Sequence, residues 1–107
     1  ALEPFATDGV GRVIDDDRTY IYSFLAFRPL RLAMAKRMMF HIKKNFPQLP
    51  FAERWVVKSK KDEFALRYLI RKSVVFPYYV LKEKTGGMIS QAEHTVIVTQ
   101  DGNEVIT

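Results

Sequence analysis

The stretch QAEHTVIVT, residues 91–99, decides how the chain is interpreted, because Glu93 stands in a run of alternating apolar residues. Such alternation is typical of a β-strand. A second glutamate, Glu3, stands in EPFATDG, residues 3–9, just before a glycine turn. Each segment would present its carboxylate from a strand into a cleft. Carboxylates are ligands for hard and borderline metals, and a bridging carboxylate is common in two-metal hydrolases.

Each glutamate also has a plainer interpretation. Glu3 on composition alone is a surface carboxylate before a turn. Glu93 would face solvent if its neighbours Ala92 and His94 point inward, whereas a buried strand glutamate would need a cation or many hydrogen bonds. The residues by themselves leave both interpretations of Glu93 open.

Length and composition limit the class of protein. The chain has 107 residues and no cysteine, which allows one small domain or a piece of a larger one and excludes disulfides, thiolate metal sites and a Cys nucleophile. No signal peptide is visible in these residues, and no apolar run has membrane-spanning length. We therefore expect a cytoplasmic protein with no membrane partner. Because the chain enters its first motif at once, we also expect a cut end.

The net charge of +5 is unevenly distributed. Residues 28–77 carry 13 Lys and Arg against 3 Asp and Glu, whereas the two flanks together carry 4 against 9. Acidic flanks suit a cation site. A basic middle suits an anionic surface such as nucleic acid or a ribosome.

Strands are predicted at both ends of the chain from β-forming residues and turn signals. Near the start, a polar turn at 15–18 separates a short strand at 13–14 from a second strand at 20–25. Near the end, the predicted elements are a strand at 74–81, a hairpin turn at 85–87, its partner strand at 89–99, a turn at 101–102 and a last strand at 103–107.

The middle of the chain has helical periodicity. Apolar residues four apart predict a helix over 30–45. Pro50 opens a shorter helix at 51–57, and Asp62 is a suitable N-cap for a third helix over 63–72. Three short helices followed by a β-hairpin are the order of a winged helix-turn-helix.

Several motifs in order resemble type II methionine aminopeptidases, the archaeal and eukaryotic class with the pita-bread fold. In this family a Glu-x-Phe motif precedes a winged-helix insert, and Gln-x-Glu-His-Thr and a last hairpin follow it. The insert carries Leu-x-Phe-x-x-Arg-Trp, which matches residues 49–55, and ends in Pro-Tyr, which matches Pro77 and Tyr78, fifteen residues before Glu93. The resemblance covers nearly every residue from Leu2 to Thr107.

The resemblance implies an α+β chain, the C-terminal half of a pita-bread fold with antiparallel strands and an inserted three-helix, winged helix-turn-helix-like subdomain. Residues 1–27 and 78–107 would be strands of the catalytic domain. Residues 28–77 would be the insert.

The resemblance also implies a site with two divalent metal ions, which Co, Mn, Fe or Zn would fit. Glu3 resembles the ligand of one metal and Glu93 resembles the carboxylate that bridges both, and these two are the expected catalytic residues. Gln91 is a candidate to orient Glu93. The family's other ligands, two aspartates and a histidine, lie upstream, and neither His41 nor His94 matches a family ligand.

The expected substrate-binding residues would hold a methionine side chain. Phe5 and Tyr78 resemble aromatic walls of this pocket, and Pro50 lies near it; thioethers pack well on aromatic rings. Plain core packing is the alternative for both aromatic residues. Two departures from the family affect the pocket, because Ala92 stands where Phe is frequent and Phe27 stands near the position of a histidine.

The implied reaction is removal of the N-terminal methionine from nascent polypeptides whose second residue is small. The implied partners are the N-termini of nascent polypeptides and the N-terminal half of the same enzyme, with the ribosome in proximity. The complete enzyme is expected to be a monomer. The chain alone is expected to be inactive.

Two other classes stay open. The first is a winged-helix nucleic-acid-binding module, favoured by the basic middle segment. Its third helix, however, has no Asn or Gln to read adenine. The second is a non-catalytic pita-bread relative that acts through partners, such as the proliferation-associated homologues, although such relatives tend to lose their metal ligands.

Overall fold

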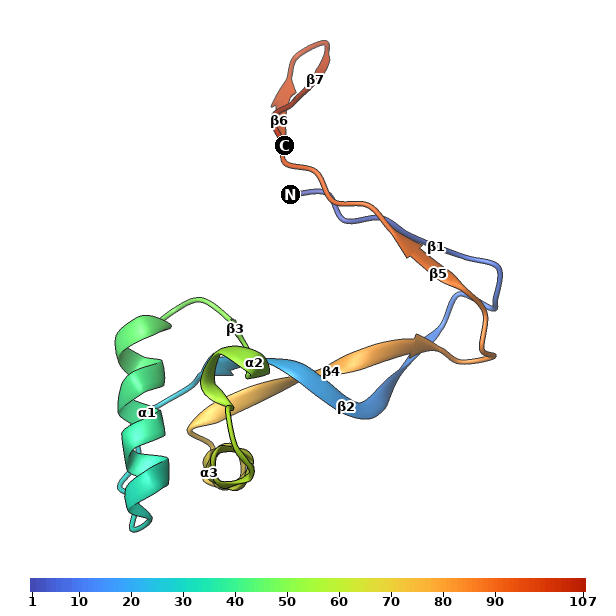
Figure 1. Ribbon diagram of the computed structural model, residues 1–107. Coiled ribbons are helices and arrows are strands. Elements are labelled where there is room, and N and C mark those ends of the chain that lie inside the picture. Colours follow the sequence, from blue (N-terminus) through green and yellow to red (C-terminus); the bar gives the residue numbers. More distant parts are fainter. The chain divides into compact units, whose positions relative to one another are not determined.

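The computed structural model describes residues 1–107 (Figure 1). The internal contacts divide the chain into two compact units, which are described separately. Unit 1 comprises residues 1–15 and 81–107, and unit 2 comprises residues 16–80. The predicted insert, residues 28–77, lies inside unit 2, and its boundaries stay a prediction.

The chain is mixed α and β, as predicted. Its strands are β1 (Phe5–Thr7), β2 (Val13–Phe24), β3 (Phe51–Ala52), β4 (Val75–Glu83), β5 (Ile89–Gln91), β6 (Val96–Thr99) and β7 (Gly102–Val105). Its helices are α1 (Ala33–Asn45), α2 (Glu53–Val56) and α3 (Lys60–Arg71). The sheets have the orders β1-β5, β3-β2-β4 and β6-β7. None of the helices is long and apolar enough to cross a bilayer.

The first long strand corrects a prediction. The polar turn expected at 15–18 is wrong, because β2 runs through it without interruption. This strand lies between β3 and β4 in its sheet, and β3 pairs only with its Ile21 and Tyr22. Incorporation into the sheet thus overrides the weak strand propensity of the polar residues. The polar residues are accommodated locally, since Arg18 Nη2 lies 2.6 Å from Asp16 Oδ2 in an ion pair.

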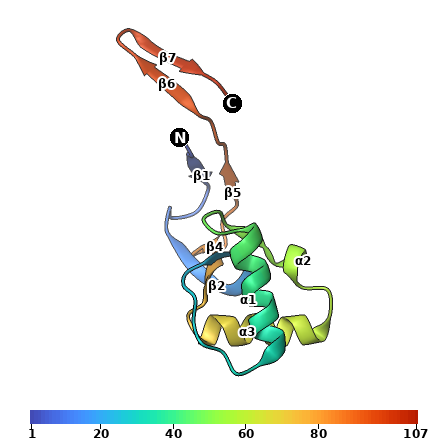
Figure 2. The ribbon, with the colours of Figure 1, turned by 90° about the vertical axis from the view of Figure 1, so that its left-hand side faces the viewer.

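The helices of unit 2 enclose the core. Helix α1 begins three residues later than predicted and buries one stripe of Ala35, Met38, Met39 and Ile42. It packs against α3, and the two helix axes cross (Figures 1 and 2). Because these apolar residues recur at helical spacing, the buried face of α1 was predictable from the sequence.

The predicted helix at 51–57 is only partly correct. Phe51 and Ala52 form β3, and the helix that follows, α2, is a single turn. Pro50 therefore precedes a strand and not a helix. The cause is tertiary packing: Phe51 is 1% exposed, pairs with Tyr22 across the sheet, and stacks on its ring at 5.9 Å between centroids.

Helix α3 begins earlier than predicted, and its N-cap is Ser59, not Asp62. The backbone N–H of Asp62 donates to Ser59 Oγ at 3.3 Å. Asp62 Oδ2 in return accepts from Ser59 Oγ at 2.8 Å and from the N–H of Lys58 at 3.1 Å. These bonds lower the pKa of Asp62, chiefly through the Ser59 hydroxyl. The pattern Ser-x-x-Asp is a form of the capping box.

The strands of unit 1 correct two further predictions. The strand expected at 89–99 is interrupted, so that Glu93 lies between β5 and β6. The expected hairpin between β4 and β5 is wrong, since β4 pairs with β2 and β5 pairs with β1. The last predicted hairpin is confirmed, because β6 and β7 are antiparallel with Thr99 opposite Gly102 (Figure 2).

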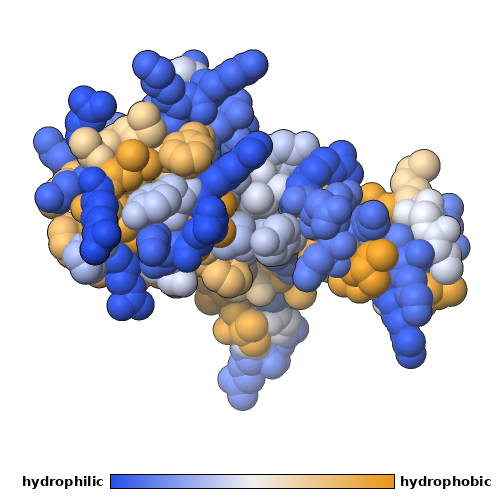
Figure 3. All heavy atoms as spheres, turned by 90° about the horizontal axis from the view of Figure 1, so that it is seen from below, coloured by the Kyte–Doolittle hydropathy of each residue, from blue (hydrophilic) through white to orange (hydrophobic).

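Unit 1 contains no buried apolar side chain. All buried hydrophobic residues belong to unit 2, whereas Leu2, Phe5, Met88 and Val98 are among those exposed in unit 1. Figure 3 shows apolar residues at the surface between hydrophilic ones. Backbone pairing and polar contacts therefore hold unit 1 together.

Candidate metal-binding carboxylates

Glu3 lies directly opposite Glu93 in unit 1. The register of β1 and β5 pairs Phe5 with Gln91, and an isolated bridge beyond the strands pairs Leu2 with His94. Leu2 and Phe5 are as far apart along the chain as Gln91 and His94. The register therefore runs unbroken through Glu3 and Glu93.

The hydrogen bonds show which kind of pair this is. Leu2 and His94 exchange both backbone hydrogen bonds, at 2.7 and 2.9 Å, and the N–H of Ala92 donates to the carbonyl of Pro4 at 3.2 Å. Glu3 and Glu93 stand between these bonded pairs and therefore form a non-hydrogen-bonded pair. In such a pair the side chains share one face, with Cβ atoms about 4.5–5.5 Å apart.

The two carboxylates lack a compensating charge. Both are exposed, and neither makes an ion pair with a Lys, Arg or His side chain. Directly opposed like charges destabilise a sheet. A cation bound between the two side chains would remove this repulsion, which makes the pair a candidate for metal ligation.

Gln91 contacts Glu3 and not Glu93, the glutamate that it was expected to orient. Its Nε2 donates a hydrogen bond to Glu3 Oε1. Gln91 is the diagonal neighbour of Glu3 across the ladder, and it lies on the same face, because residues two apart on a strand point the same way. No hydrogen bond supports a role of Gln91 in orienting Glu93. The hydrogen bond that Gln91 makes supports a role in orienting Glu3.

Phe5 stands opposite Gln91 and on the same face as the two glutamates. Its side chain is 60% exposed, so it does not belong to a packed core. The structure thus brings four of the six predicted site residues together on one face of unit 1. The alternative of plain core packing is not what the structure shows for Phe5.

Tyr78 and Pro50 belong to unit 2. Tyr78 lies on β4, where its ring meets that of Phe76 edge-on at 5.3 Å between centroids and its carbonyl accepts from Thr19 Oγ1 at 2.8 Å. Pro50 is exposed and directly precedes β3. Both side chains are accessible within their own unit.

Neither histidine joins the carboxylates. His41 is exposed on α1, and its Nδ1 lies 3.3 Å from Asn45 Nδ2, so it is a helix-surface residue. His94 lies on the face of the ladder opposite to that of Glu93, and its Nδ1 contacts the carbonyl of Thr107 at 2.7 Å.

The donor set fits part of a metal site. No three His, Asp or Glu side chains of the chain lie close enough together to hold an ion. Two opposed carboxylates supply hard oxygen donors. A transition-metal site usually has four or more ligands, so the remaining donors have to come from outside these residues.

Glu83, at the end of β4, is a buried carboxylate that the sequence analysis missed. It is 4% exposed and accepts hydrogen bonds from Val10, Thr85 and Gly87. These bonds, first of all the one from the Thr85 hydroxyl, lower the pKa of Glu83 to about 2 although burial acts to raise it. The only sequence signal was the glycines of two separate turns, Gly9 and Gly87.

Methionine aminopeptidases of several archaea match the whole chain, although no family model matches it. The methionine aminopeptidases of Methanocaldococcus jannaschii and Methanothermobacter thermautotrophicus are both 50% identical to it, over 107 and 110 residues. That of Archaeoglobus fulgidus is 44% identical over 107 residues. The resemblance to archaeal methionine aminopeptidases is therefore confirmed. In each comparison all of this chain is covered, but only 36% or 37% of the relative.

A solved structure supports the fold. The structure of a thermophilic Arx1 superposes with a TM-score of 0.80 over 97% of this chain and 28% of its own length. The two sequences are 18% identical, so this likeness speaks for the pita-bread fold alone. The chain spans about a third of the length of the methionine aminopeptidases it matches.

Proposed function

We propose that this chain supplies two metal-ligating carboxylates to a dinuclear-metal methionine aminopeptidase. The complete protein would remove the N-terminal methionine from nascent polypeptides with a small second residue. The observation that carries the proposal is the direct opposition of Glu3 and Glu93 without a counter-charge. The identity of 50% to named methionine aminopeptidases supports the reaction class.

The two glutamates have different roles in this proposal. Glu3 would be a ligand of one divalent ion, and Glu93 would be a ligand of both ions. Gln91 would hold the Glu3 carboxylate in place through its Nε2 hydrogen bond. When bound, the metal ions lower the pKa of a water molecule so that hydrolysis proceeds near neutral pH.

The substrate methionine would lie beside the carboxylates. Phe5 shares their face of the ladder and would form one wall of the side-chain pocket. The substrate-binding roles of Tyr78 and Pro50, which belong to unit 2, stay a prediction. Mn, Co, Fe and Zn all fit oxygen and imidazole ligands. The other ligands, two aspartates and one histidine, would come from the rest of the protein, which would also cover the exposed apolar residues of unit 1.

The finer architecture is proposed as well. Residues 28–77 would be a winged helix-turn-helix-like insert between the strands of 1–27 and 78–107. The three helices and the adjoining sheet support this assignment. The complete enzyme would act as a monomer in the cytoplasm, where nascent chains emerge.

Release of methionine from Met-Ala-Ser with added Mn²⁺ tests the proposal on the protein that carries this chain. Native mass spectrometry first establishes which polypeptides are present. Glu3→Gln and Glu93→Gln should each abolish release, whereas Glu104→Gln, the same charge change on β7, should not. Full activity of the Glu93→Gln protein would reject the proposal.

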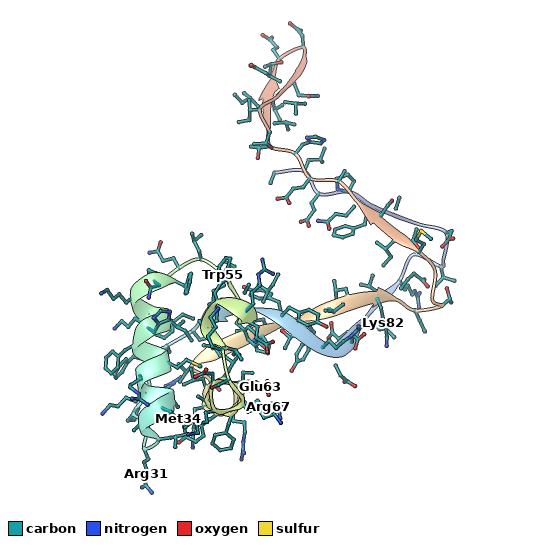
Figure 4. All side chains as sticks on the ribbon, in the orientation of Figure 1. Arg31, Met34, Trp55, Glu63, Arg67 and Lys82 are labelled. Atoms are coloured by element: carbon teal, nitrogen blue, oxygen red, sulfur yellow. The ribbon has the colours of Figure 1, made fainter.

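Nucleic-acid binding is a second candidate function, favoured by the charge of unit 2. That unit carries 14 Lys and Arg against 5 Asp and Glu. Its helix α3 presents Arg67, but Glu63 projects from the same side and offsets it (Figure 4). Salt-dependent binding of duplex DNA would support this candidate, and absence of binding at low salt would reject it.

A further inference from the structure

Two loops of unit 1 flank the strands that bear the candidate ligands. Residues 8–12 follow β1, and Glu3 lies two residues before the start of that strand. Residues 84–88 precede β5, beyond which Glu93 lies. The relative position of these loops therefore fixes how far one strand is shifted along the other.

One carboxylate joins the two loops. Glu83 Oε1 accepts from the N–H of Val10, in the first loop, at 2.9 Å. Glu83 Oε2 accepts from Thr85 Oγ1 at 2.6 Å, from the N–H of Thr85, and from the N–H of Gly87 at 3.1 Å. Donors from both loops thus converge on one buried side chain, and all of them favour its ionised form.

Further contacts tie the same loops together. The N–H of Met88 donates to Asp8 Oδ1 at 2.8 Å, and the N–H of Lys84 donates to the carbonyl of Arg12 at 2.8 Å. The approach is so close that a Cβ on Gly9 would lie 2.3 Å from the Glu83 carboxyl carbon. A Cβ on Gly87 would lie 2.7 Å from the backbone nitrogen of Gly9.

The strands themselves specify their register weakly. β1 and β5 have three residues each, and all but one of these six residues are exposed. Register is poorly determined where no face of a strand pair is buried. A slip of one residue would turn Glu93 to the other face, and a slip of two would place Glu3 opposite Gln91 or Thr95.

We propose that Glu83 is a positioning residue that holds the two strands in the register that sets Glu3 opposite Glu93. It touches neither glutamate and acts through the backbone of both loops. That this register serves metal binding rests on the proposed function. The register itself is independent of that proposal. Disulfide trapping can therefore test the role of Glu83 without any assay of activity.

The chain has no cysteine, so introduced pairs report on the register directly. Phe5→Cys with Gln91→Cys is an in-register, non-hydrogen-bonded pair, and Phe5→Cys with Ile89→Cys matches a two-residue slip. With Glu83 present, only the first pair should cross-link efficiently. With Glu83→Gln, the slipped pair should gain at least several-fold in yield, while the Glu104→Gln control stays like the parent.

Glu83→Gln could also simply lower stability, and a second measurement separates that effect. Mn²⁺ affinity is measured by calorimetry at a temperature where circular dichroism shows the variant to be folded. We expect the Kd to rise about tenfold or more, the usual effect of losing a group that orients metal ligands. Thr85→Val, which removes one donor, should give a smaller rise.

The outcomes distinguish the two proposals. Unchanged cross-linking of both cysteine pairs in the Glu83→Gln protein would overturn the positioning role, whatever the enzyme does. If Glu83→Gln releases the slipped pair but Glu3→Gln leaves the Mn²⁺ affinity unchanged, Glu83 holds the register and the proposed metal function fails. Loss of register together with loss of Mn²⁺ affinity supports both.

Discussion

Glu3 and Glu93, ninety residues apart in the chain, face each other across two antiparallel strands as a non-hydrogen-bonded pair. Their carboxylates share one face with Phe5 and with Gln91, which hydrogen-bonds Glu3. Apart from that bond, no side chain compensates the two negative charges. The arrangement is unfavourable for a plain sheet and suitable for binding a cation.

This repulsion leads to a prediction about stability without metal. Glu93→Gln removes one of two opposed charges, so in the presence of a chelator it should raise the free energy of unfolding by roughly 0.2–1 kcal/mol. Added Mn²⁺ should make the parent more stable than Glu93→Gln, because only the parent protein gains stability from binding the ion. Thermal unfolding with and without Mn²⁺ measures both effects. A Glu93→Gln protein that is less stable in chelator would contradict the idea of an uncompensated pair.

Glu83 should make stability depend on pH in the acid range. Its pKa is lowered to about 2 from a usual 4.5, chiefly by the Thr85 hydroxyl, so the unfolded chain takes up the proton more readily. The stabilisation from Glu83 is therefore complete above about pH 4.5 and is lost as the pH falls toward 2.

The difference in unfolding free energy between the parent and Glu83→Gln should accordingly shrink over that acid range. Urea unfolding at several pH values measures it, with Glu104→Gln as the charge-matched control. A difference that is independent of pH would show that Glu83 is not held as the anion.

Tyr22 should give a pH dependence in the alkaline range. Burial, and then the negative charge of Glu53, raise the pKa of Tyr22 to about 12 from 10; its hydroxyl lies 3.3 Å from Glu53 Oε2. The stabilisation is present below pH 10 and is lost as the pH rises toward 12. Tyr22→Phe should remove this dependence, whereas Tyr20→Phe, in the same strand but exposed, should leave it. If the parent and Tyr22→Phe lost the same stability between pH 10 and pH 12, Tyr22 would not be the source of the alkaline dependence.

The N-cap of α3 can be tested by substitution. Ser59→Ala leaves the N–H of Asp62 without its acceptor and should cost about 1 kcal/mol of stability. Ser59→Asn retains an acceptor at the cap position and should recover most of that loss. Chemical denaturation measures both variants. If Ser59→Ala left the stability unchanged, Asp62, the residue predicted from the sequence, would be the N-cap.

The sequence predicted what local pattern determines. The buried face of α1 follows from apolar residues at helical spacing, and the last hairpin follows from the Asp-Gly turn. The cap at Ser59 was also within reach, since Ser-x-x-Asp precedes the helix. Elements that depend on distant contacts were predicted less well: Phe51 is drawn into a strand because it packs on Tyr22.

The candidate site shows the same division. Both carboxylates were identified from their motifs, but their direct opposition depends on a register that three-residue strands do not encode. The contact of Gln91 with Glu3 instead of Glu93 follows from that register. Glu83 was not found because its donors come from two loops more than seventy residues apart, and no single segment reveals them.

Calorimetric titration of Mn²⁺ shows whether Glu3 and Glu93 together hold metal. The titration is made on the protein that carries this chain and on its Glu3→Gln, Glu93→Gln and Glu104→Gln variants. We expect Glu3→Gln and Glu93→Gln to lose at least tenfold in Mn²⁺ affinity, whereas Glu104→Gln should bind like the parent. Equal Mn²⁺ affinity in all four proteins would mean that Glu3 and Glu93 are not metal ligands.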